Sequence, residues 1–265
     1  ESFSTTPAAE GGSVILNKAV IPHETLLNQA KEQYEAAEKT AKSDVLKSFK
    51  GFDQDAAIRQ VKTYELKLAM HRGQYADAKT FVEGALKDGE TVEVIYNNDG
   101  GDNPLYSAIG PNSRDVQVSP SLEAARTTDA EKKALPLAHA SVDKKNPNRY
   151  NIYASGLTRK GSMIISNDDD IHLIKAELIV RGVMTGDAMT EVNKVIGKYD
   201  TASQLSTAPT LAQIAELRRI FLAFRGERTA DIRRGLEQGS SATTWASRKI
   251  KWLPMPEKEL QSQGL

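Results

Sequence analysis

Cysteine is absent from this chain of 265 residues, which excludes disulfides, thiolate metal sites and cysteine nucleophiles. An excess of charge is also lacking, because 35 basic and 35 acidic residues give a net charge of zero. Such a chain has no global field that would attract nucleic acid, so we expect no nucleic-acid partner. No apolar run approaches the roughly 18 residues that a membrane-spanning helix requires. With 39% hydrophobic and 26% charged residues, the composition predicts a globular protein with one sizeable core or two small ones.

Signatures of catalysis and of metal binding are missing as well. The four histidines, at positions 23, 71, 139 and 172, include no pair with the i, i+4 spacing of a zinc-binding helix. The chain contains no P-loop, no GxGxxG motif and no GxSxG motif. We therefore expect that the protein is not an enzyme and that it holds neither a cofactor nor a metal ion.

Helical periodicity occupies both ends of the chain. Residues 1–12 are small and polar and are interpreted as a tail or linker. Apolar residues then recur every three or four positions, which predicts helices over 23–41, 56–72 and 75–87, a helical pair over about 170–197, and a last helix over 210–224. The sequence thus predicts a mainly helical single domain at 13–265, with a loop-rich insertion containing short strands at about 91–169.

The helices at 56–72 and 75–87 follow the tetratricopeptide pattern. Gly73 is predicted to end the first helix in a left-handed conformation, and a short turn leads into Tyr75. The small side chain of Ala78 would let the two helices approach closely, while Tyr75 would wedge between neighbours. The alternative is a helical hairpin unrelated to that repeat.

The insertion contains the residues that we expect to bind a ligand. Alternation predicts a strand at 91–96, residues 97–104 form a dense turn cluster, and a helical turn is possible at 121–135. Aromatic residues make up only 6% of the chain, but Tyr96 and Tyr106 flank the cluster. A sugar packed on a tyrosine could hydrogen-bond to Asn98 and Asp99. The alternatives are ordinary loop packing of the tyrosines and a calcium site in the cluster, although a plain turn is favoured because the helix-loop-helix spacing is missing.

Residues 218–234, RRIFLAFRGERTADIRR, resemble the late signature helix of the SusD/RagB family. The positions that carry the resemblance are Arg218, Arg219, Phe224, Gly226, Arg228, Asp231 and Arg234. The tail at 253–260 resembles the family's C-terminal proline-rich segment, and the two helical pairs fall in the family's order. Four positions depart from the pattern. Phe221 and Arg225 stand where the family usually has glutamates, and Thr229 and Ala230 replace a usual aromatic pair.

The charged residues of this segment have two interpretations. The arginines and Asp231 could form a buried ion-pair network that ties the last helix to the repeat core, and we favour this interpretation because arginine–carboxylate sets are common structural elements. The alternative is an anion-binding site.

The resemblance implies an outer-membrane lipoprotein on the cell surface. Such a protein caps a SusC-like TonB-dependent transporter and captures oligosaccharides or peptides for import. The family's N-terminal portion with its lipidated cysteine has no counterpart here, and the chain begins at Glu1, so we expect a processed chain, a fragment or a compact member. The alternatives from other classes are a tetratricopeptide scaffold that binds a partner's peptide and a structural or assembly subunit.

Overall fold

The computed structural model describes residues 23–48, 50–96, 101–110, 118–141 and 150–236. The helices in these ranges are α1 (His23–Ala41), α2 (Asp44–Lys47), α3 (Gln54–His71), α4 (Tyr75–Val82), α5 (Pro104–Ile109), α6 (Pro120–Ala125), α7 (Asp129–Ala134), α8 (Asp168–Val180), α9 (Ala188–Gly197), the 3-10 helix η1 (Thr201–Ser203), α10 (Leu211–Phe221) and α11 (Glu227–Arg233). The strands are β1 (Thr91–Val94), β2 (Leu137–Ser141), β3 (Tyr150–Ala154) and β4 (Met163–Asn167). The predicted fold class is confirmed. Within the described part of the chain, no helix is long and apolar enough to cross a membrane.

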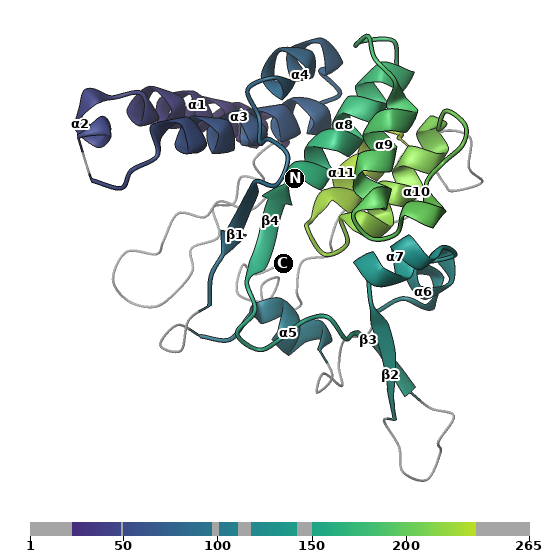
Figure 1. Cartoon of the computed structure of the whole chain (residues 1–265). Helices are drawn as coiled ribbons and strands as arrows, with labels where there is room; N and C mark the ends of the chain where they lie inside the picture. The colour runs from purple at the N-terminus through teal and green to yellow at the C-terminus, as the bar shows by residue number, and fades with distance from the viewer. Residues whose placement is uncertain (1–22, 49, 97–100, 111–117, 142–149, 237–265) are drawn as a thin grey trace, which may run out of the picture.

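The helices and strands occupy different regions of the molecule (Figure 1). α1 and α3 run side by side, and α8 to α11 gather into one body beside them. The ribbon of β1 and β4 descends from this body, and the hairpin of β2 and β3 extends below α6 and α7. The insertion is therefore attached to one side of a helical frame.

α3 and α4 form the hairpin that the tetratricopeptide pattern predicts. The carboxylate of Asp53 accepts a hydrogen bond from the Ala56 amide (2.9 Å) and caps the start of α3. Gly73 has φ +70°, so the chain reverses in a left-handed conformation and α4 begins at Tyr75. Ala78 is fully buried against the apolar side chains of α3, which allows the close approach of the two helices.

α4 is shorter than predicted, because it ends at Val82 rather than near residue 87. The amides of Gly84 and Ala85 donate to carbonyls three residues earlier (3.0 and 3.4 Å), which tightens the chain into a turn. The amide of Leu86 then donates to the Thr63 hydroxyl of α3 (3.0 Å) instead of continuing the helix. Ala85 and Leu86 are still buried, as the periodicity predicts.

Replacing Ala78 with phenylalanine is expected to lower the free energy of unfolding by roughly 1–3 kcal/mol, because the larger side chain overpacks a closed helix interface. Thermal melts of the variant and the parent would measure the loss. Ala76→Phe, at an exposed position of the same helix, is the control and should melt close to the parent. Equal melting of Ala78→Phe and the parent would contradict the close packing of α3 and α4.

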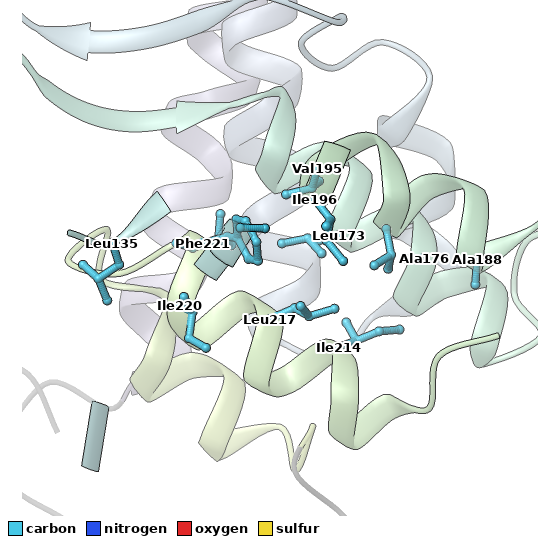
Figure 2. Close-up of a cluster of buried hydrophobic side chains, with 13 residues drawn as sticks. Leu135, Leu173, Ala176, Ala188, Val195, Ile196, Ile214, Leu217, Ile220 and Phe221 are labelled. Carbon is cyan, nitrogen blue, oxygen red and sulfur yellow. The ribbon is translucent and has the colours of Figure 1, made fainter. Parts of the chain in front are cut away.

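α8 lies at the centre of the frame and is buried on two sides. Leu173 belongs to a core cluster shared with α9 and α10, and Figure 2 shows Ile214 and Leu217 of α10 facing it. Ile174, on another side of the same helix, belongs to a second cluster with α3 and α4. α8 therefore joins the repeat hairpin to the C-terminal helices, as expected of a helix that is apolar on several faces.

Residues 218–234 do not form one helix, and this part of the prediction is wrong. α10 ends at Phe221, before the predicted end at 224, and α11 begins at Glu227. Between them, Phe224 (φ +66°) and Gly226 (φ +82°) adopt left-handed conformations that interrupt the helix. The guanidinium of Arg225 stabilises this break by reaching the Asp170 carboxylate (2.8 Å) at the start of α8.

Two antiparallel ribbons organise the insertion. β1 pairs with β4, with an irregularity between Val92 and Glu93, and β2 pairs with β3. The short helices α5, α6 and α7 lie between these strands in sequence, where only a helical turn at 121–135 was predicted. Helices of six residues are too short to show a helical period, so the sequence pattern missed α5.

Candidate ligand-binding site

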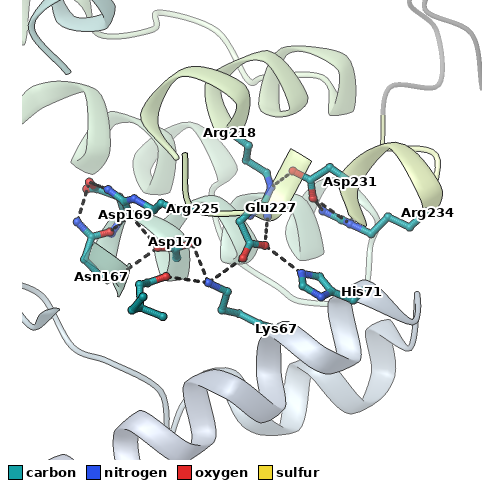
Figure 3. Close-up of polar contacts among 11 residues, drawn as sticks. Lys67, His71, Asn167, Asp169, Asp170, Arg218, Arg225, Glu227, Asp231 and Arg234 are labelled. Atoms are coloured by element: carbon teal, nitrogen blue, oxygen red, sulfur yellow. Dashed lines mark hydrogen bonds and ion pairs between the residues drawn. The ribbon is translucent and has the colours of Figure 1, made fainter. Parts of the chain in front are cut away.

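Residues of the signature meet in a buried ion-pair network (Figure 3). Nε of Arg218 donates to Oδ2 of Asp231 (2.8 Å), and its Nη2 donates to Oε2 of Glu227 (3.3 Å). Arg234 donates to Oδ1 of Asp231 (2.7 Å) and makes two hydrogen bonds to Glu177 of α8. These five side chains are at most 5% exposed. Because both guanidinium groups already have carboxylate partners, the geometry favours structural ion pairs over an anion site.

Two side chains of α3 extend this network. Nζ of Lys67 lies 2.7 Å from Oε1 of Glu227, and Nε2 of His71 lies 3.1 Å from Oε2. Burial raises the pKa of Glu227, but the hydrogen bond with His71 and the charges of Lys67 and Arg218 outweigh it and hold that pKa well below its usual range. Glu227 thus stays ionised and ties the repeat hairpin to the signature. Sequence reasoning missed Lys67 and His71 because their partner lies far away in the chain.

Other residues of the signature lie outside the network. Arg219 is partly exposed and donates to Glu216 (3.1 Å) and to the Ser121 hydroxyl (2.9 Å). Arg228 is partly buried in α11. The remaining two positions, Phe224 and Gly226, form the break between α10 and α11.

The predicted ligand-binding residues are only partly described. Tyr96 follows β1 and Tyr106 lies in α5, and both side chains are partly exposed. Asn98 and Asp99 lie outside the described residues. Both tyrosines are therefore accessible to a ligand in part.

α5 is fixed to the loop that precedes β4. The side chain of Asn103 is 1% exposed, accepts a hydrogen bond from the Leu105 amide (2.9 Å) and donates to the Gly161 carbonyl (2.9 Å). The Asn103 amide donates to the Arg159 carbonyl (2.9 Å). This buried asparagine caps α5 and sets the position of Tyr106 relative to the loop.

Charged side chains of that loop lie near Tyr106. Nε of Arg159 donates to Oδ2 of Asp102 (2.8 Å), and Nζ of Lys160 lies 3.3 Å from Oδ1. The hydrogen bond to Asp102 raises the pKa of the Arg159 guanidinium, and Tyr106 adds a smaller electrostatic contribution in the same direction. A tyrosine ring can stack on a sugar face, and charged side chains of a neighbouring loop can hydrogen-bond to the sugar hydroxyls. The sequence did not single out Asp102, Arg159 or Lys160, because residues 102 and 159 are brought together only by the fold.

In the part of the chain that the structure describes, no group of three or more histidine, cysteine, aspartate or glutamate side chains is arranged to hold a metal ion.

Comparison with known proteins bears on the fold. No family model matches the chain, and no curated protein matches it. Among solved structures, the chain is similar to surface glycan-binding protein A from Bacteroides thetaiotaomicron, with a TM-score of 0.58 and 17% identity over 89% of this chain and 69% of that one. It is also similar to the same protein in complex with laminarihexaose, with a TM-score of 0.57 and 18% identity over 88% and 68%. The chain therefore shares the fold of this surface glycan-binding protein.

Proposed function

We propose that this chain is a SusD/RagB-type protein that binds oligosaccharides at a cell surface. The observation that carries the proposal is the shared fold with a surface glycan-binding protein whose solved complex holds laminarihexaose. The sequence signature at 218–234 supports the same assignment independently of that comparison. Peptides are the second ligand class that the family resemblance implies.

We place the binding site in the insertion, at Tyr96, Asn98, Asp99 and Tyr106. Asp102 and Arg159, which are paired with each other next to the start of α5, extend this set with a charged acceptor and a charged donor. Stacking on a tyrosine and a few hydrogen bonds leave micromolar to millimolar affinity after desolvation. The helical frame supplies rigidity, and the insertion supplies the contacts.

Binding is proposed to occur without cleavage of the glycosidic bond. A glycosidase needs two carboxyl groups, one of which has a raised pKa and acts as an acid. Near Tyr106, the hydrogen bond from Arg159 lowers the pKa of Asp102 instead. Incubation with laminarihexaose should therefore release no new reducing ends.

The partner and the location are also proposals. By family resemblance, the protein works with a SusC-like TonB-dependent transporter on the outer face of the outer membrane. Fractionation of the native cells would test this, because the chain should appear in the outer-membrane fraction and copurify with the transporter. Recovery of the chain from the cytoplasm alone would contradict both the proposed location and the proposed transporter partner.

Replacing Tyr106 with alanine is expected to weaken oligosaccharide binding by roughly twofold to tenfold, the range expected for the loss of one aromatic contact. Calorimetric titration with laminarihexaose and with a panel of other oligosaccharides and peptides would measure the effect. Tyr106→Phe keeps the ring and is the matched control, so it should retain most of the affinity. Tyr96→Ala should weaken the same ligand. Unchanged affinity in both alanine variants would mean that the binding site lies elsewhere.

The tetratricopeptide scaffold is the competing function, and one feature favours it. A groove of about 200 Å³ lies between α1, α3 and α4, and it is lined by apolar and charged side chains that include Arg72, Asp77 and Phe81. A scaffold would bind peptides in this groove and no oligosaccharide. If the chain bound peptides and no oligosaccharide, and if Phe81→Ala abolished this binding while Tyr106→Ala left it unchanged, the scaffold function would be supported. The glycan proposal would then be contradicted.

A further inference from the structure

A separate cavity lies between the insertion and the helical frame. Its volume is about 380 Å³, within the range of roughly 300–1,000 Å³ that is common for small-molecule sites. Its walls come from α5, α7, β3, β4 and α10, with Leu105, Leu135, Ala154, Met163 and Phe221 among the lining residues. Elements from both parts of the fold thus line one partly open cavity, whose side chains are mostly apolar.

The lining is unsuited to a sugar. Among the described residues it contains no aspartate, glutamate, asparagine or glutamine, the side chains that usually accept hydrogen bonds from sugar hydroxyls. Most hydroxyls of a sugar placed here would lose hydrogen bonds to water, because Ser162 and Tyr199 are the uncharged polar side chains of the lining. The cavity is therefore distinct in chemistry from the polar surface around Tyr106.

Aromatic rings form part of the wall. The rings of Tyr199 and Phe221 lie 5.4 Å apart at an angle of 54°, and Phe224 lines the same cavity. Phe224 holds a left-handed conformation, which is uncommon for a bulky residue, and it is partly exposed. The break between α10 and α11 thus places a phenylalanine ring on an apolar space that can still be reached.

The charged side chains of the lining, Lys133 and Arg225, are both cationic. Arg225 is compensated by Asp170 (2.8 Å) and by Asn167, so it offers little free charge. Lys133 is 55% exposed, and within the described residues its Nζ donates one hydrogen bond, to Oδ1 of Asp200 (3.4 Å). Surface pairs of this kind contribute little, so an incoming carboxylate can replace Asp200 as the partner of Lys133.

We propose that this cavity binds a small aryl carboxylate. The apolar ring would pack against Phe221 and Phe224, and the carboxylate would pair with Lys133. This site is separate from the proposed oligosaccharide site and does not rest on it.

The proposal is tested by titrating the full chain with trans-cinnamate, with cinnamyl alcohol as the neutral analogue. The methyl groups of methionine, labelled with carbon-13, report the location, because Met163 lines the cavity whereas Met70, Met184 and Met189 do not. We expect the Met163 signal, assigned with Met163→Leu, to shift on addition of cinnamate while these other three stay in place. No shift of the Met163 signal at millimolar cinnamate would overturn the proposal.

Two pairs of variants test the packing and the charge. Ala223→Phe fills the cavity and should reduce cinnamate affinity at least tenfold, whereas Ala212→Phe on α10 lies outside the lining and should not.

Lys133→Gln should weaken the binding of cinnamate by roughly twofold to fivefold and leave the binding of cinnamyl alcohol unchanged. Lys132→Gln is the matched control, since Lys132 is equally exposed but absent from the lining. Equal effects of the two glutamine variants would overturn the carboxylate assignment. Ala223→Phe should bind laminarihexaose with unchanged affinity. That outcome would show that the loss of cinnamate binding is separate from the proposed glycan function.

Discussion

Arg218→Ala is expected to lower the free energy of unfolding by roughly 3–5 kcal/mol, the cost of removing one partner from a buried ion pair. Arg218 is 1% exposed and donates to both Asp231 and Glu227. Its removal leaves two buried carboxylates with less compensation, and the space that it vacates is closed to water. Urea unfolding followed by circular dichroism would measure the loss.

Arg219→Ala is the matched control, because the neighbouring arginine is partly exposed and pairs with Glu216 at the surface. Its loss should cost at most about 1 kcal/mol. If both alanine variants unfolded at the same urea concentration, the network around Arg218 would not stabilise the fold as its geometry indicates.

The second large effect is an acid-induced loss of stability. Burial raises the pKa of Asp231, but the charges of Arg218 and Arg234 outweigh it and lower that pKa; the pKa of Glu227 is lowered in the same manner. A lowered folded pKa means that the unfolded chain takes up protons first as the pH falls. The stabilisation is therefore fully present above the unfolded pKa values of roughly 4 and is lost below them, at about 1.4 kcal/mol for each unit of pKa difference.

Urea unfolding between pH 7 and pH 3 would follow this loss, and Glu227→Gln identifies its source. The variant should be less stable than the parent at pH 7, and its stability should fall less steeply below pH 4.5. Asp187→Asn is the control, because the pKa of this exposed carboxylate is lowered by a hydrogen bond from Thr190 at the surface. If the free energy of unfolding of Glu227→Gln fell with pH as steeply as that of the parent, groups other than Glu227 would cause the acid sensitivity.

Local rules account for the parts of the fold that the sequence predicted. The helix over residues 23–41 and the pair on either side of Gly73 follow from apolar spacing and from one glycine that tolerates a left-handed turn. The helical pair at 170–197 follows in the same way, and Asn167 caps its first helix together with Asp170. Each of these features is specified by residues within a few positions of one another.

The parts that the sequence missed depend on distant residues. Nothing near Phe224 in the sequence predicts a left-handed phenylalanine, because the break is stabilised by Arg225 reaching residue 170. The early end of α4 depends on Thr63 accepting the Leu86 amide. At the candidate site, Tyr106 could be chosen from its position beside a turn cluster, but Arg159 joins it only through the docking of Asn103.

The contact between His71 and Glu227 also sets an order of events during synthesis. These residues are 156 positions apart in the chain. At about 5–20 residues per second, roughly 8–30 s pass on the ribosome between their appearance. During that time the α3–α4 hairpin carries Lys67 without its nearest counter-charge, and a stop codon before position 227 would remove that counter-charge permanently. The nascent chain therefore cannot complete its ion pairing until the C-terminal helices have been made.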